Sequence, residues 1–128
     1  MLIPMIGGAR VNEVEQFVAL MRRTPFVMKD EKSVQAAIAV VLDSHGIAYK
    51  REVKLSEGDI VDFMLPGGVA VEVKLNKAQK REIFRQCKRY CEHEQVKVIV
   101  LMTATIMGFP PEIEGKPAYY ISMGRSWL

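Results

Sequence analysis

The turn sequence Pro66-Gly67-Gly68 lies between two apolar runs and constrains the fold of this chain more than any other feature. Proline followed by paired glycines is typical of a tight reversal, so the flanking runs are expected to pair as an antiparallel β-hairpin. If these three residues form the loop, Leu65 pairs with Val69, and Asp62 then lies directly opposite Glu72. Their Cβ atoms are expected about 5 Å apart, which brings two like charges together on the sheet.

After the turn, apolar and charged side chains alternate. Successive residues of a strand point to opposite faces, so Glu72 and Lys74 share one face while Val71 and Val73 point to the core. Two carboxylates this close destabilise a sheet unless a cation lies between them. Lys74 is one candidate, and a hard ion such as Mg²⁺, which prefers carboxylate oxygens, is another. Taken alone, the pattern also fits an exposed strand face with solvated charges.

Length and composition indicate an ordinary globular domain, since the chain has 128 residues, 49% of them apolar and 26% charged. The apolar segment 1–8 lacks a basic leader and is too short to span a membrane, so we expect a cytoplasmic protein without a membrane partner. The two cysteines, Cys87 and Cys91, do not have the spacing of a four-cysteine zinc site. A metal site built from them and His93 has no obvious source of further ligands.

Hydrophobic periodicity predicts an α/β fold with a mixed sheet of four to five strands flanked by helices. Helices are expected from about residue 12 to 23, from 30 to 45 and from 77 to 92. Strands are expected at 47–55, 60–65, 69–75, 96–102 and 118–122. We divide the single domain 1–128 into an N-terminal extension with one helix (1–29), a core (30–105) and a C-terminal loop and strand (106–128).

The third helix carries a stripe of positive charge. Four basic residues recur at every fourth position, and two more widen the stripe. They are Lys77, Arg81, Arg85 and Arg89, with Lys80 and Lys88 beside them. Each pair of like charges costs about 0.2–0.5 kcal/mol in an isolated helix, so an anion is expected along the stripe. Nucleic acid is the obvious polyanion, and the alternative is an outer helix face solvated by long basic side chains.

Gln86 and Tyr90 are also four residues apart, on the flank of this helix that is expected to turn toward the sheet. They can point back toward the face that carries Glu72 and Lys74. The alternative is that Tyr90 is a core aromatic and Gln86 a surface residue.

At this point the residues resemble a known family, because the order helix, three strands, helix, strand over residues 31–102 is that of the PD-(D/E)XK nuclease superfamily. In this sequence the motif is Asp62 followed by Glu72-Val73-Lys74, with Glu31 in the first turn of the preceding helix. Val61 stands where the family usually has a proline. The resemblance implies a restriction-endonuclease-like core.

The resemblance also implies roles for these residues. Asp62 and Glu72 would hold Mg²⁺ or Mn²⁺ together with the backbone carbonyl of Val73, and Glu31 would join directly or through a water. Lys74 would lie against the attacking water or the scissile phosphate, where fixed positive charge stabilises the transition state.

Two further residues complete the predicted catalytic set. Gln86 and Tyr90 resemble the Gln-x-x-x-Tyr motif of the RecB-like branch, and in that role they would orient the substrate strand. Glu52 competes with Glu31 for the remaining acidic position, because it belongs to a predicted strand that can face the same cleft. Glu31 is favoured by its place in the order of the family.

The function implied is that of a Mg²⁺-dependent deoxyribonuclease acting in DNA repair or recombination. The alternative is a non-catalytic nucleic-acid-binding module or a nuclease subunit. A Holliday-junction-resolvase-like endonuclease and an exonuclease both stay open, and the sequence does not distinguish DNA from RNA. A domain of this size has little surface to enclose DNA, so a homodimer or a larger nuclease assembly is expected.

Overall fold

The computed structural model describes residues 5–6, 9–75 and 79–124. Its elements follow in the order β1 (Met5–Ile6), β2 (Ala9–Arg10), α1 (Val11–Arg23), α2 (Glu31–Ser44), β3 (Lys50–Lys54), β4 (Ile60–Leu65), β5 (Val69–Lys74), α3 (Lys80–Cys91), β6 (Val98–Thr103), β7 (Glu112–Ile113) and β8 (Lys116–Ser122). From α2 to β6 this is the predicted order of helix, three strands, helix and strand.

A mixed six-stranded sheet has the order β3-β4-β5-β6-β8-β7. The strands β3, β4 and β5 are antiparallel neighbours, β6 and β8 run parallel to β5, and β7 is antiparallel to β8. The predicted count of four to five strands was therefore too low. The additional strand, β7, has two residues, which is too short for an alternation of apolar and polar side chains to reveal.

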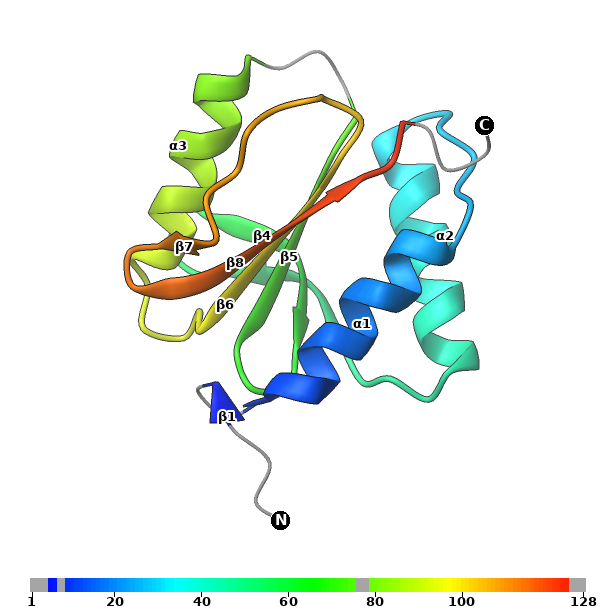
Figure 1. Ribbon diagram of the computed structural model, residues 1–128, viewed down its shortest axis with the longest axis horizontal. Helices are drawn as coiled ribbons and strands as arrows, with labels where there is room; N and C mark the ends of the chain where they lie inside the picture. The colour runs from blue at the N-terminus through cyan, green and yellow to red at the C-terminus, as the bar shows by residue number, and fades with distance from the viewer. Residues whose placement is uncertain (1–4, 7–8, 76–78, 125–128) are drawn as a thin grey trace.

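The sheet lies between two helical layers (Figure 1). Helices α1 and α2 cover one face, where they pack against Val71 and Val73 of β5, and α3 covers the other face, where it packs against Ala70. Phe17 and Met21 of α1 are buried in the first of these layers. The predicted N-terminal extension therefore contributes to the core.

The hairpin turn has the predicted register, with Leu65 paired to Val69. Gly67 and Gly68 adopt φ of 84° and 78°, a region that side chains disfavour. A Cβ on Gly68 would lie 2.7 Å from the backbone oxygen of Gln95. Glycine is therefore required at this position by both conformation and space.

Helix α3 is shorter than predicted within the described residues, where it runs from Lys80 to Cys91. Lys77, the first member of the predicted basic stripe, lies outside the described residues. None of the helices that the structure describes is long and apolar enough to cross a membrane.

Candidate functional site

The strands β4 and β5 separate just where the predicted acidic residues lie. Their pairing runs from Leu65 and Val69 to Phe63 and Val71, the last pair in the ladder. On the other side of β4, the pairing with β3 keeps one register throughout, but Glu52, opposite Asp62, has no partner in the ladder and adopts φ of 51°. Beyond the pair Phe63 and Val71, side chains link β4 to β5 across a gap in the ladder.

Asp62 and Glu72 fill this gap. The backbone N–H of Asp62 donates to Oε1 of Glu72 at 3.4 Å, and Oδ2 of Asp62 accepts from the backbone N–H of Val73 at 2.7 Å. Glu72 is only 3% exposed. The hairpin thus brings the two carboxyl groups together, as its register predicted.

Burial controls the protonation of this pair. It raises the pKa of Asp62, and it raises the pKa of Glu72 to about 9, with the charge of Asp62 adding to the effect. A hydrogen bond between the two carboxyls lowers the pKa of Asp62 and raises that of Glu72. The pair therefore keeps a proton at neutral pH in the absence of a metal.

Glu31 approaches the same gap from the first turn of α2. Its Oε2 accepts from the backbone N–H of Leu75 at 3.0 Å, and its charge acts to raise the pKa of Asp62, although burial is the main cause of that shift. Glu52 is exposed, and its charge is not among the causes that shift the pKa of Asp62, whereas that of Glu31 is. The structure thus brings Glu31, and not its competitor Glu52, to the carboxyl pair.

The backbone of β5 supplies one more oxygen to this region. N–H groups of alternate residues point to the same edge of a strand, and here those of Val73 and Leu75 donate to Asp62 and Glu31. The carbonyl of Lys74 points the opposite way and accepts from Ala104. The Val73 carbonyl consequently lies on the edge that faces the gap, between the two carboxylates.

These oxygens match the ligands that Mg²⁺ and Mn²⁺ prefer, since a buried carboxyl pair is stabilised when a cation replaces its proton. Among the described residues, no group of three or more His, Cys, Asp or Glu side chains already converges on one point. The reason is that Glu31 is turned to Leu75, while Asp62 and Glu72 face each other. The oxygens of Asp62, Glu72 and Val73 therefore fit a metal ion, while Glu31 lies beside them and is bonded to Leu75.

Lys74 is the cation beside this pair. Its Nζ lies 3.7 Å from Oε2 of Glu72, and its side chain is 23% exposed. It also lines a hollow of about 200 Å³ between β5 and α3, together with Gln86 and Arg89. Lys74 thus joins the buried acids to a space that solvent can enter.

Tyr90 lies deeper than its predicted role requires, because it is 2% exposed. Its hydroxyl donates to the carbonyl of Ile60 at 3.0 Å and accepts from Nε2 of Gln86 at 2.8 Å. Burial raises the pKa of Tyr90, so the hydroxyl keeps its proton. Tyr90 therefore links α3 to the start of β4 and holds the side chain of Gln86. Of these two residues, Gln86 is the one that lines the hollow between β5 and α3.

Tyr90→Phe is expected to destabilise the protein by about 1–3 kcal/mol, because the Ile60 carbonyl loses its buried donor. Denaturant unfolding measures this change. Tyr119→Phe is the matched control, since no residue in the described part of the chain bonds to the Tyr119 hydroxyl, and its effect is expected within about 0.5 kcal/mol. Equal effects of the two substitutions would contradict the positioning role of Tyr90.

The basic stripe is partly neutralised within the chain. Arg85 pairs with Glu82, Lys88 with Glu92 and Glu114, and Arg89 with Asp59. An anion is therefore not needed to relieve repulsion at these three positions, contrary to the argument from the sequence. Lys80 and Arg81 have no ion pair with any described residue.

Asp59 was not indicated by the sequence, where it reads as part of a turn. It is buried and accepts hydrogen bonds from Arg89 and from the ring of His93, at 3.1 and 3.0 Å. These bonds, that of His93 first, lower the pKa of Asp59. Asp59 therefore anchors the end of α3 to the start of β4.

Cys87 and Cys91 are free and buried on the side of α3 that faces the sheet. Burial raises the pKa of the Cys87 thiol to about 12. A protonated thiol is a poor metal ligand. Burial likewise raises the pKa of Cys91, so both thiols keep their protons at neutral pH.

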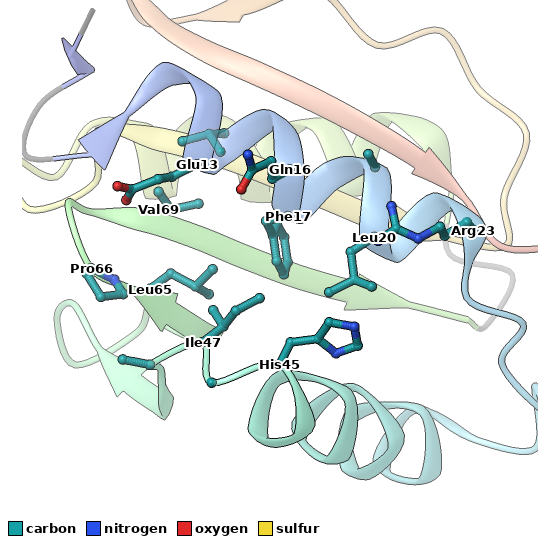
Figure 2. Close-up of a pocket in the computed structure, with 14 residues that line it drawn as sticks. Glu13, Gln16, Phe17, Leu20, Arg23, His45, Ile47, Leu65, Pro66 and Val69 are labelled. Carbon is teal, nitrogen blue, oxygen red and sulfur yellow. The ribbon is translucent and has the colours of Figure 1, made fainter. Parts of the chain in front are cut away.

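A larger hollow of about 530 Å³ lies between α1 and the segment that follows α2 (Figure 2). Its apolar lining is contributed by α1, by residues after α2 and by the hairpin, including Phe17, Leu20, Ile47, Leu65, Pro66 and Val69. Glu13 is the only acid among the described residues that line it. The buried carboxyl pair, Asp62 and Glu72, lies instead at the gap between β4 and β5.

Comparison of the chain with protein-family models, with curated proteins and with solved structures gave no match. Its function is therefore argued from the geometry of the site.

Proposed function

We propose that this protein is a metal-dependent nuclease that hydrolyses phosphodiester bonds in DNA, with the restriction-endonuclease-like core of the PD-(D/E)XK superfamily. The observation that carries the proposal is the buried pair Asp62 and Glu72, set in a break of the sheet with Lys74 beside it. Burying two carboxyl groups together costs stability. A bound cation would offset this cost, because it neutralises the two carboxyl groups where a phosphate can also bind.

Asp62, Glu72 and the carbonyl of Val73 would hold Mg²⁺ or Mn²⁺, and Glu31 would join directly or through a water. When bound, the ion lowers the pKa of a water and offsets the charge that develops on the phosphate.

The remaining chemistry belongs to the chain. Lys74 places a fixed positive charge at the mouth of the hollow, where it stabilises negative charge on the reacting phosphate. Gln86 presents its amide to the same hollow and orients the strand, while Tyr90 holds Gln86 in place. The burial of Glu72 excludes water and strengthens these electrostatic interactions.

The outer surface of α3 would bind the DNA backbone. Lys80 and Arg81 are exposed and free of internal ion pairs within the described residues, so they are available to phosphates at no cost to the fold. We include the other predicted basic residues, which are Lys77, Arg85, Lys88 and Arg89. Those of them with internal ion pairs would exchange an acidic partner for a phosphate.

A second candidate is a non-catalytic nucleic-acid-binding module or a nuclease subunit. It is favoured by the turning of Glu31 toward Leu75, which leaves fewer than three converging acids among the described side chains. A homodimer or a larger assembly would complete the surface for DNA in either case. Within the nucleases, a Holliday-junction-resolvase-like endonuclease and an exonuclease are both compatible with the site.

The test is a cleavage assay with labelled single-stranded, duplex, flapped and four-way-junction DNA, in Mg²⁺ and in Mn²⁺. We expect cutting of at least one substrate with either metal and none in EDTA. Labelled RNA in the same assay decides between the two nucleic acids. Binding without cutting on every substrate would favour the non-catalytic module.

A further inference from the structure

Arg51 of β3 carries a guanidinium that the fold holds in place. Its Nη2 donates to Oε1 of Gln35 at 3.3 Å, and its Cζ lies 5.3 Å from the centre of the Phe63 ring. Gln35 is a buried residue of α2, and Phe63 is fully buried in β4. Two rigid elements thus orient one exposed cation.

This cation lacks an acidic partner. Within the described residues, Arg51 forms no ion pair, whereas Arg85, Lys88 and Arg89 of the basic helix all do. A neutral amide and an aromatic face orient a guanidinium without cancelling its charge. Arg51 is therefore organised for an anion that comes from outside the chain, and its flat donor array suits a phosphate.

Its position relates it to the acidic gap. Arg51 pairs with Phe63, the residue directly after Asp62, and Gln35 lies one helical turn after Glu31 on α2. Burial raises the pKa of Asp62, and the charges that modify this shift are those of Lys74 and Glu31, not that of Arg51. Arg51 consequently lies beside the acidic residues and not among them.

We infer that Arg51 binds a phosphate of the substrate strand that neighbours the scissile phosphate, on the α2 side of the gap. The inference rests on the proposed function and extends it. Helices α2 and α3 lie on opposite faces of the sheet (Figure 1). Lys80 and Arg81 on α3 and Arg51 on the α2 side would therefore contact the substrate on the two sides of the acidic pair.

The test compares Arg51→Met with Lys50→Met. Methionine keeps an apolar stem against Phe63 and removes the guanidinium. Lys50 is the matched control, because it is an exposed neighbour with the same charge whose side chain points to the opposite face of the strand. The measurement is the fluorescence anisotropy of a labelled single strand of DNA in EDTA, at several salt concentrations.

Arg51→Met is expected to weaken binding about five- to tenfold. It should also reduce the salt slope, which is the slope of the logarithm of the binding constant against the logarithm of the salt concentration, by about 0.7, the value for one phosphate contact on a single strand. Lys50→Met is expected to keep the wild-type slope. In Mg²⁺, Arg51→Met should raise KM and leave kcat within about twofold, since the residue does not touch the reacting phosphate.

A wild-type slope in Arg51→Met, or a fall in kcat at unchanged KM, would overturn the inference. If the wild-type protein binds the strand but cuts no substrate, a reduced slope still supports Arg51 as a phosphate ligand while the nuclease proposal fails. A wild-type protein that binds no nucleic acid overturns both.

Discussion

Lys74→Met is expected to lower kcat for DNA cleavage by about a hundred- to a thousandfold, the usual effect of removing one preorganised charge from a transition state. The Lys74 Nζ lies 3.7 Å from Glu72 and lines the hollow that leads to the acidic gap. The fold should remain, because the shared proton already neutralises one of the two buried acids. Single-turnover cleavage in Mg²⁺ measures the loss, and circular dichroism measures the fold.

Binding of Mg²⁺ separates a chemical role of Lys74 from damage to the site. By calorimetry, Lys74→Met should bind the ion at least as tightly as the wild-type protein, because a cation next to Glu72 has been removed. Lys97→Met is the matched control, since Lys97 lies beside Gly68 at the opposite end of β5. A wild-type rate in Lys74→Met would exclude this lysine from the chemistry.

We expect the effect of Glu72→Gln on the free energy of unfolding of the metal-free protein to be more favourable at pH 8 than at pH 5. The difference between the two pH values is on the order of 2–4 kcal/mol. The folded protein raises the pKa of Glu72 from 4.5 to about 9. Stability from this group is therefore fully present below about pH 4.5 and is lost as the pH rises toward 9. Glutamine resembles the protonated acid and cannot ionise, so it does not show this loss.

Denaturant unfolding in EDTA at several pH values measures the difference. Glu82→Gln is the matched control, because Glu82 is an exposed acid of α3, and its effect should be nearly independent of pH in this range. Mg²⁺ at pH 8 is expected to stabilise the wild-type protein and not Glu72→Gln. Parallel stability curves for wild type and Glu72→Gln would show that Glu72 is not protonated in the folded state.

Local chemistry made much of the architecture predictable from the sequence. Proline and glycine fixed the turn at Pro66-Gly67-Gly68, and with it the register that brings Asp62 to Glu72. Alternation along β5 correctly separated Val71 and Val73 from Glu72 and Lys74. Each of these features depends on residues close together in the chain, where backbone conformation and side-chain direction follow simple periods.

The short elements and the ion pairs were not predictable in this way. The two-residue strand β7 is too short to show a period, so the sheet has one strand more than expected. The pairing of Arg89 with Asp59 joins residues 30 positions apart. The sequence therefore overstated the free charge of α3, because it shows which charges are present but not which ones meet.

What the sequence alone determined is the order of the elements from α2 to β6, the hairpin and the identity of the acidic residues. Only the tertiary structure decided that the pairing of β4 with β5 ends before Asp62 and that Glu31 bonds to β5 beside the carboxyl pair. It also decided that Arg51 is held by Gln35 without an acidic partner among the described residues. The physical reason is that burial and the meeting of distant side chains arise from packing. Packing depends on contacts between elements that are far apart in the chain, and the periodicity of a single helix or strand does not reveal those contacts.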